Sequence, residues 1–144
     1  MIKPEELRIG NLVACEMLDG VKHVEVESIN HRGINLSVDF GSISPDISFE
    51  NIEGIDITGE LLLKFGFRKM NSPLSRTIFV LWIDDTTEIE IEKDVEDEFI
   101  VTLILTYEDF NRMQDNVAYK HFRGYKVHNL QGLHFVLTGK QLKV

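Results

Sequence analysis

The chain has 144 residues, a formal net charge of −9 at pH 7 and a single cysteine, Cys15. This length suits one domain or two small lobes that share a core. The lone cysteine excludes an internal disulfide and any paired-cysteine metal or redox motif, which favours a reducing compartment. Residues 1–6 carry acids where a signal peptide has its apolar core, and no segment approaches the roughly 20 apolar residues of a membrane span. We therefore expect a cytoplasmic protein with no membrane partner.

A β-hairpin is predicted near the N-terminus. An Asp-Gly pair at 19–20 separates residues 12–18 from residues 21–30, and both segments alternate apolar with polar side chains. A two-residue turn at this pair places Leu18 opposite Val21. Because side chains two positions apart share a face of a strand, this register predicts which residues point toward the core.

Further short strands are predicted after the hairpin. Residues 34–40 alternate apolar with polar side chains, and shorter β-segments are expected near 47–49 and 55–57. About five short strands linked by tight turns favour a small barrel over a helix-covered sheet. We therefore predict an SH3-like barrel lobe for residues 1–57.

A second lobe is predicted for residues 58–144. Thr58 caps a short helix that ends at Gly66. Interior strands are expected at 77–83 and 99–105, because both segments are short and apolar on both faces. Together with the strand between them, they are expected to form an antiparallel β-meander.

The last part of the chain is expected to end in a helix. Residues 106–116 are compatible with a short helix, because Thr106 and Asp109 have capping-box spacing, or with a loop. Apolar side chains at spacings of three and four, followed by Gly139, predict a helix over 126–138 that is buried against the sheet. The predicted fold class is α+β and mostly β: an N-terminal SH3-like small barrel, then an antiparallel β-meander and a C-terminal helix, packed as one compact unit.

Three segments resemble a group of small uncharacterised proteins encoded by gut anaerobic bacteria, their phages and mobile elements. They are residues 6–13 (ELRIGNLV), 57–67 (ITGELLLKFGF) and 127–142 (VHNLQGLHFVLTGKQL). Each is also what a turn, a capped helix or a buried helix requires. The resemblance implies the setting of a phage or mobile element, and it implies no activity, substrate or site.

The chain departs from the pattern of this group at three positions. Gly59 stands where an acidic residue is usual, Gly132 where a larger polar residue is usual, and His134 where an aromatic one is usual. Two of these changes introduce glycine, which weakens helix propensity.

No catalytic or metal-binding motif is recognised. Signatures of the nucleophile elbow, the zinc proteases, dinucleotide sites and phosphate-binding loops are absent. The hairpin register turns Cys15 toward the core and His23 to the opposite face, so we expect a buried, inert thiol. His128 and His134 are spaced too far apart on the last helix to chelate a metal ion. His134 lies in the apolar stripe and is predicted to be a core histidine with a hydrogen-bond partner, or alternatively an interface residue.

Most of the net negative charge falls in residues 84–98. Glu88, Glu90 and Glu92 alternate with isoleucines, which predicts a strand with one wet face and carboxylates about 6.7 Å apart. One interpretation is a solvated face whose charges prevent edge-to-edge pairing. A second interpretation is an acidic nucleic-acid mimic that occupies the cationic groove of a DNA-binding partner.

Bases and rings alternate in residues 119–126, as they do on platforms for single-stranded nucleic acid. The overall negative charge opposes that interpretation. Alternatively, Tyr119, His121, Arg123 and Tyr125 form one face of a strand. In a third interpretation this segment faces the acidic strand, either within the meander or across a symmetric dimer.

The sequence therefore favours a non-enzymatic protein-interaction or accessory module. No catalytic residue, cofactor or metal is expected, although an enzyme whose site is assembled from residues far apart in sequence is a competing hypothesis. Two further hypotheses are nucleic-acid binding through residues 119–126 and mimicry of nucleic acid through residues 84–98. The candidate interaction surface consists of Glu88, Glu90, Glu92, Lys120, His121, Arg123 and Tyr125.

Overall fold

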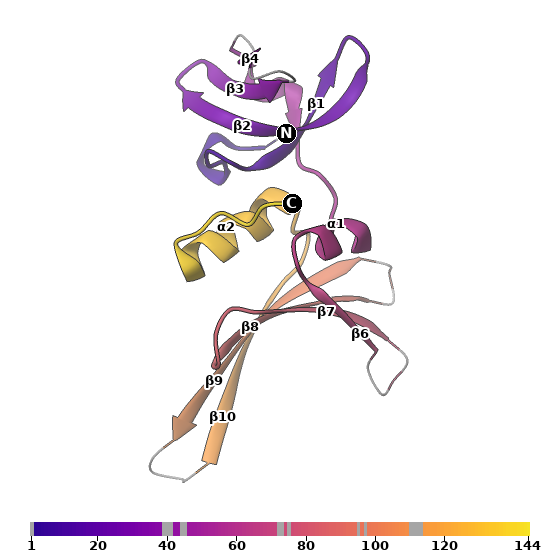
Figure 1. The fold of residues 1–144 in the computed structure, drawn as a ribbon, viewed down its shortest axis with the longest axis vertical. Helices are drawn as coiled ribbons and strands as arrows, with labels where there is room; N and C mark the ends of the chain where they lie inside the picture. The colour runs from indigo at the N-terminus through magenta and orange to yellow at the C-terminus, as the bar shows by residue number, and fades with distance from the viewer. Residues whose placement is uncertain are drawn as a thin grey trace. The chain divides into compact units, whose positions relative to one another are not determined.

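The computed structural model describes residues 2–38, 42–43, 46–71, 74, 76–94, 96, 98–109 and 114–144. The chain divides into two compact units (Figure 1). Unit 1 comprises the segments up to Asp56 and from Lys126 to Lys143, and unit 2 comprises Ile57–Tyr125. Each unit contains one five-stranded antiparallel sheet, so the protein is α+β and mostly β as predicted. None of the helices in the described part of the chain is long and apolar enough to cross a membrane.

The sheet of unit 1 has the order β4-β3-β2-β1-β5. Its elements in chain order are the 3₁₀ turn η1 (Pro4–Glu6), β1 (Leu12–Met17), β2 (Gly20–Asn30), β3 (Gly33–Val38), β4 (Ser42–Ile43), the 3₁₀ turn η3 (Phe49–Asn51), β5 (Ile52–Glu53) and, from the C-terminal segment, α2 (Val127–Thr138). All neighbouring strands are antiparallel.

The predicted hairpin forms, but its two turn residues are one position earlier in the chain than predicted. Met17 lies opposite Gly20 and Cys15 opposite Lys22, so the two turn residues are 18–19. Gly20 has a φ of +114°, which glycine adopts without the strain that a side chain would bring. The shift moves the partner strand by an even number of residues, so each side chain keeps its predicted face. The thiol of Cys15 is accordingly buried.

The later strands of unit 1 differ from the expected positions. The strand predicted over 34–40 is β3, and residues 39–40 lie outside the described residues. The segment near 47–49 makes one isolated bridge between Ile34 and Ile47 and then turns into η3. The last strand is β5, a few residues before the predicted 55–57.

The two ends of this sheet do not meet. β2 is long and shifts register between Val26 and Ser28, so its first part pairs with β1 and its second part with β3. Such a bulge bends a strand. Among the described residues no pairing joins β4 to β5, so a closed barrel is not formed and the SH3-like expectation is not confirmed.

The core of unit 1 lies on one face of these strands and includes the N-terminal segment. Its buried residues are Ile2, Leu7, Val13, Cys15, Val26, Ile34, Leu36 and Ile52, with Met17, Val24, Ile29, Ile47 and Phe49 packed against them. Burying this apolar surface is the main favourable contribution to the stability of the unit.

The predicted C-terminal helix is confirmed as α2. It ends at Gly139, whose amide donates to the carbonyl of Phe135. The sequence grouped this helix with the second lobe, whereas in the structure it belongs to unit 1 and lies beside β1. The chain re-enters unit 1 where Asp56 and Lys126 form an isolated β-bridge and an ion pair.

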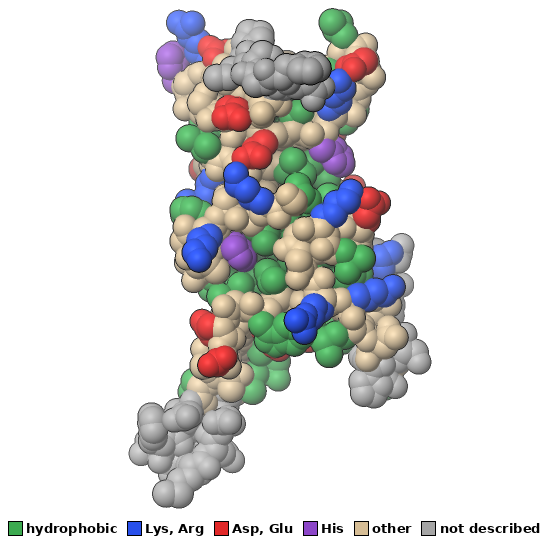
Figure 2. Space-filling model, viewed as in Figure 1, with side chains coloured by type: hydrophobic (Ala, Val, Ile, Leu, Met, Phe, Trp, Pro, Cys, Tyr) green, Lys and Arg blue, Asp and Glu red, His purple; other side chains and the backbone are tan. Residues whose placement is uncertain are grey.

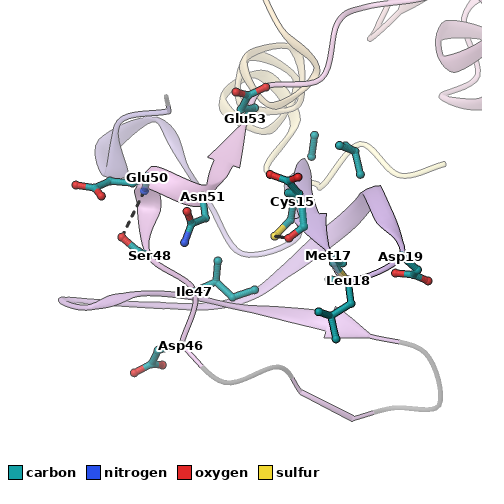
Figure 3. A pocket seen from close by; sticks show the side chains of 13 residues that line it. Cys15, Met17, Leu18, Asp19, Asp46, Ile47, Ser48, Glu50, Asn51 and Glu53 are labelled. Atoms are coloured by element: carbon teal, nitrogen blue, oxygen red, sulfur yellow. Dashed lines mark hydrogen bonds between the residues drawn. The ribbon is translucent and has the colours of Figure 1, made fainter.

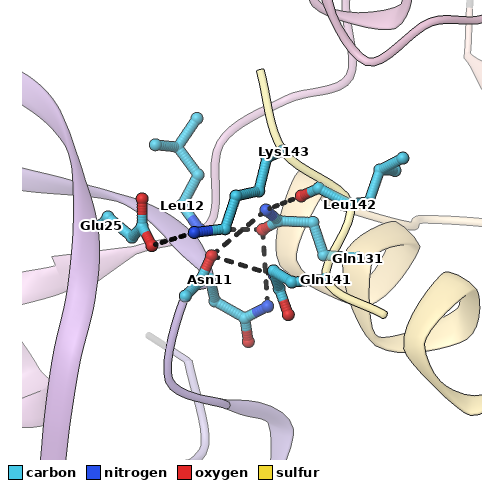
Figure 4. A network of polar contacts seen from close by, with 8 residues as sticks. Asn11, Leu12, Glu25, Gln131, Gln141, Leu142 and Lys143 are labelled. Carbon is cyan, nitrogen blue, oxygen red and sulfur yellow. Dashed lines mark hydrogen bonds and ion pairs between the residues drawn. The ribbon is translucent and has the colours of Figure 1, made fainter. Parts of the chain in front are cut away.

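A buried glutamine joins α2 to the N-terminal strands (Figure 4). The side-chain oxygen of Gln131 accepts a hydrogen bond from the backbone N–H of Leu12 at 2.8 Å, and its Nε2 donates to the carbonyl of Leu142 at 2.8 Å. The amide of the buried Asn11 also donates to Gln131, at 3.4 Å. Buried polar groups of this kind are costly when unpaired, so the network specifies how α2 docks.

The sheet of unit 2 has the order β10-β9-β8-β7-β6, and the predicted antiparallel meander is confirmed. Its elements are α1 (Gly59–Lys64), β6 (Arg68–Asn71), β7 (Thr77–Trp82), β8 (Thr87–Lys93), β9 (Phe99–Asp109) and β10 (Gln114–Phe122). Residues 106–116 were expected to form a short helix or a loop, whereas residues 106–109 and 114–116 extend β9 and β10. Residues 110–113 lie outside the described residues.

One face of this sheet is apolar and packs against α1. Phe79, Ile91 and Val101 are cross-strand neighbours on that face, and all three are buried. A Cβ atom at Gly59 would lie only 2.9 Å from the ring of Phe79. The close approach of helix and ring therefore favours a glycine at position 59, because a larger residue would displace the ring. Thr58 caps the helix as predicted.

Candidate interaction site

The three glutamates of β8 lie on the sheet face opposite the apolar one. All three side chains are half-buried. Their cross-strand neighbours on β7 and β9 are Trp82, Val80, Ile78, Ile104, Thr102 and Ile100. We call Glu88, Glu90 and Glu92 the carboxylate row, and the sheet surface that carries it the carboxylate face.

The position of the carboxylate row corrects one interpretation of the sequence. β8 is the middle strand of five, and it is hydrogen-bonded to β7 on one side and β9 on the other. A charge protects a sheet from edge-to-edge pairing only when it lies on an edge strand. Edge protection therefore does not explain why three acids occupy this strand.

The electrostatic environment of the row is unfavourable. Burial raises the pKa of Glu90 above its ordinary value, and the negative charges of Glu92 and Glu88 raise this pKa further. In the described part of the chain, Arg76 makes an ion pair with the row, at 3.8 Å from Glu92. Repulsion between like charges and partial loss of hydration both destabilise the folded state. The charge of Glu90 is thus disfavoured where an uncharged β-former would suit the strand.

Aromatic side chains flank the row on the same face. Trp82 is 48% exposed and Tyr119 is 62% exposed. The guanidinium of Arg68 lies 5.7 Å from the centre of the Trp82 ring, and Tyr119 stacks beside His121 with ring centres 6.5 Å apart. His121 Nδ1 and the Thr102 hydroxyl share a hydrogen bond of 2.9 Å. The carboxylate face therefore combines negative charge with two accessible aromatic rings.

The predicted basic and aromatic segment is not a single platform. His121 shares the carboxylate face with the row, because it pairs with Thr102, whereas Lys120 pairs with Leu103 on the opposite face. Arg123 follows the strand and forms an ion pair of 2.9 Å with Asp94. The arrangement therefore gathers four of the seven predicted surface residues and leaves Lys120, Arg123 and Tyr125 elsewhere.

Two further observations concern this segment. The Tyr125 ring stacks on Phe122 with ring centres 4.8 Å apart. β9 lies between β8 and β10, so the basic strand does not directly neighbour the acidic one within the meander, as one interpretation had it. On the face drawn in Figure 2, blue basic and red acidic side chains are interspersed and the coloured atoms show no continuous basic surface.

A groove in unit 1 was not anticipated from the sequence. It has a volume of about 1260 Å³ and lies between β1 with its turn and the segment from Asp46 to Glu53 (Figure 3). The lining residues are Ala14, Cys15, Glu16, Met17, Leu18, Asp19, Val21, Asp46, Ile47, Ser48, Glu50, Asn51 and Glu53. The carboxylates that line the groove come from separate segments of the chain, and no local sequence motif predicts them.

The groove is lined by one thiol and several carboxylates, and no histidine is among its lining residues in the described part of the chain. Burial raises the pKa of the Cys15 thiol, and the charge of Glu16 raises it further, so the reactive thiolate is disfavoured. His23, the predicted opposite-face residue, pairs with Ala14 and is not among the lining residues. Within the described ranges, no group of three or more His, Cys, Asp or Glu side chains could hold a metal ion.

Two histidines of α2 have contrasting environments. His128 is buried, and its Nδ1 has no hydrogen-bond partner. Burial lowers the pKa of His128, with the nearby Lys126 acting in the same direction and Glu6 opposing. His134 is only half-buried, and its Nδ1 lies 2.9 Å from the carbonyl oxygen of Lys140. The predicted hydrogen-bond partner of His134 is confirmed, whereas its predicted place in the core was wrong.

Comparisons with known proteins give no further assignment, because no family model, curated protein or solved structure matches the chain.

Proposed function

We propose that this protein is a non-enzymatic interaction module whose carboxylate face binds a cationic surface of a partner protein. The observation that carries the proposal is the placement of Glu88, Glu90 and Glu92 on the middle strand of the sheet. Glu90 is half-buried between Glu88 and Glu92, and burial together with the charges of both neighbours disfavours its ionisation at a position where packing favours an uncharged residue. Groups whose ionisation is disfavoured in this way concentrate at functional sites.

The chemistry of the face defines its ligand. Carboxylates at a spacing of about 6.7 Å match basic side chains presented at intervals of two residues on an extended segment. Aromatic rings attract cations through their π-faces, which adds to the same preference. The Tyr119 ring is exposed, and the Trp82 ring already has the Arg68 guanidinium 5.7 Å from its centre. Arginine is suited to both contacts, because its guanidinium binds carboxylates in a bidentate manner and stacks on rings.

The setting and finer fold are part of the same proposal. The resemblance of residues 6–13, 57–67 and 127–142 supports an accessory factor of a phage or mobile element that acts in the cytoplasm. The order β4-β3-β2-β1-β5, in which the last strand returns to pair with the first after a 3₁₀ turn, supports an open SH3-like arrangement for unit 1. A second copy of the chain is one candidate for the partner.

Affinity capture from the source cells tests the function. The wild-type chain, a Glu88→Gln/Glu90→Gln/Glu92→Gln variant and a matched control are used as baits, and captured proteins are quantified by mass spectrometry. Support is a basic protein that the triple variant loses and that binds the purified wild-type chain with strong salt dependence.

The matched control is Asp85→Asn/Glu96→Gln/Glu98→Gln. It removes the same charge from exposed positions of unit 2 that lie outside the row. If the control loses the partner to the same extent as the row variant, the binding reflects net charge and the proposed site is wrong. A chain that captures nothing basic under these conditions also refutes the proposal.

Nucleic-acid mimicry is a second candidate supported by the same row. The carboxylate spacing is close to the phosphate repeat of a nucleic-acid strand, so a DNA-binding partner would be displaced from DNA by the wild-type chain and not by the row variant. Direct nucleic-acid binding through residues 119–126 predicts instead a gel shift that survives moderate salt and is lost in Lys120→Ala/Arg123→Ala. The two experiments separate these candidates from the main proposal.

A further inference from the structure

We infer that the groove of unit 1 is a second binding site, which accepts an extended basic segment of a protein partner as an added strand along β1. The site is separate from the carboxylate face, and its ligand is recognised by backbone pairing together with charge. The open edge of β1 at Glu16 and Met17, the charge of the groove and its apolar floor all favour such a ligand.

The edge of β1 beside the groove is paired at one end and open at the other. β5 pairs with β1 at Ala14 and Cys15, and the chain before Ile52 turns into η3, so within the described residues the edge at Glu16 and Met17 has no strand partner. Residues 14–17 of β1 and the turn residues 18–19 all line the groove. Consecutive residues of a strand line one groove only when the strand presents its backbone edge, since alternate side chains point to opposite faces. An unpaired edge of this kind is a template for another extended chain.

The charge of the groove selects a cationic segment. Its charged lining residues are all acids, namely Glu16, Asp19, Asp46, Glu50 and Glu53. Asp19 is paired with Lys22 at 2.6 Å, and Asp46 accepts hydrogen bonds from the amides of Asn30 and Asn35. Within the described residues the other three carboxylates make no ion pair, and all three side chains are exposed. Basic groups on a bound segment would therefore meet carboxylates that lack a cation.

The floor of the groove provides contacts for apolar side chains. Met17 and Ile47 are half-buried against the core of unit 1. Leu18 in the turn and Val21 at the start of β2 are 111% and 68% exposed. Exposed apolar side chains next to a concave surface are typical of binding sites. The volume of about 1260 Å³ exceeds the roughly 300–1,000 Å³ of small-molecule pockets, which favours a peptide segment.

Fluorescence anisotropy with defined peptides tests the inference. The probe is a fluorescein-labelled heptapeptide that alternates lysine and valine, and it is titrated with the full chain. We expect saturable binding that weakens with salt. An alternating glutamate and valine peptide, and a lysine and valine peptide methylated on alternate backbone nitrogens, are expected not to bind, because the first has the wrong charge and the second cannot pair with a strand edge.

Matched variants locate the binding. Glu50→Gln/Glu53→Gln is expected to weaken the interaction about two- to thirtyfold, the range for loss of two exposed ion pairs. Glu5→Gln/Glu27→Gln removes the same charge from exposed positions of unit 1 outside the groove and should leave the dissociation constant within a factor of two. Because an alternating lysine and valine peptide also fits the carboxylate face, every titration is repeated with Glu88→Gln/Glu90→Gln/Glu92→Gln in the background. Binding that persists in this background and is weakened by Glu50→Gln/Glu53→Gln belongs to the groove, so the outcome is independent of the proposed function.

The inference is overturned by any of three results. These are absence of saturable binding, equal binding of the backbone-methylated peptide, and an equal loss in the groove variant and its matched control. Circular dichroism of each variant shows whether the fold is retained. Because all substituted side chains of the two unit 1 variants are exposed, no loss of structure is expected.

Discussion

Neutralising the centre of the carboxylate row should stabilise the protein. In the Glu90→Gln variant the amide has nearly the shape of the carboxylate and carries no charge, so it removes the repulsion from Glu88 and Glu92 and part of the cost of burying an ion. We expect the free energy of unfolding at pH 7 to increase. Most single substitutions lower it, so the sign of the change is itself informative.

The magnitude follows from the spacing of the strand. Each neighbouring carboxylate lies about 6.7 Å away along β8. With an effective dielectric constant of about 40–80, two unit charges at this separation repel by about 0.6–1.2 kcal/mol, and screening at physiological ionic strength roughly halves that value. The two neighbours of Glu90 together account for about 0.5–1 kcal/mol, which corresponds to an increase in Tm of about 2–4 °C.

The pH dependence has a defined sign. The pKa of Glu90 is raised in the folded state, so between the folded and unfolded pKa values the folded protein binds more protons and becomes more stable as the pH falls. The advantage of Glu90→Gln is therefore full at pH 7 and declines as the pH falls through the folded pKa toward the unfolded value of about 4.3. It should also shrink in high salt.

Urea unfolding followed by tryptophan fluorescence measures this effect. Trp82 is the single tryptophan, belongs to unit 2 and pairs with Glu88, so its emission reports on the relevant sheet. Asp85→Asn, which removes one charge from an exposed position, serves as the control and should change stability by less than about 0.5 kcal/mol. A Glu90→Gln variant that is less stable than wild type, or no more stable than the control, refutes the electrostatic argument.

Three further predictions concern buried polar groups and a helix cap. Because burial lowers the pKa of His128, the unfolded state binds more protons below pH 6.5, so the free energy of unfolding should fall as the pH drops from 7 toward 5. In His128→Phe the urea midpoint should depend less on pH over this range, and an unchanged slope contradicts the assignment. Gln131→Leu leaves the amide of Leu12 and the carbonyl of Leu142 without their partner, so the free energy of unfolding measured by chemical denaturation should fall by about 2–4 kcal/mol. A fall of less than about 0.5 kcal/mol, the usual scatter for surface substitutions, speaks against the network. Thr58→Ala removes the N-cap bond of α1 and should cost about 1 kcal/mol, with Thr58→Ser retaining most of the stability.

Local patterns predicted most secondary structure because they depend on nearby residues. Alternation of apolar and polar side chains located β1, β3 and β8, and the spacing of apolar residues located α2. The hairpin turn was predicted at 19–20 and lies at 18–19, because the sequence does not decide whether Gly20 ends the turn or begins the strand. The faces of Cys15 and His23 were nevertheless correct, because the actual shift is even.

The features that were missed depend on long-range contacts. The place of α2 in unit 1 depends on Gln131, which meets Leu12 across 119 positions of the chain. The groove combines residues 14–19 with the segment from Asp46 to Glu53, and neither contains a motif. β8 is the middle strand of five because β6 and β10 extend the sheet on its two sides, and β6 was not predicted. The carboxylate row was found from alternation, and the predicted meander already placed it between two strands; the observed pairing on both sides excludes edge protection.

The discontinuity of unit 1 has a consequence for biosynthesis. The chain leaves the unit after Asp56 and returns at Lys126, where these two residues are bridged to each other. Domains generally fold in order as they emerge from the ribosome, N-terminal first. Here the first strands must wait for the last segment to be translated, because Gln131 completes their hydrogen bonding, while the sheet formed from 57–125 has all of its strands earlier. A chain that stops before Lys126 would thus have a finished meander and an incomplete unit 1, and would be a ready substrate for cellular proteases.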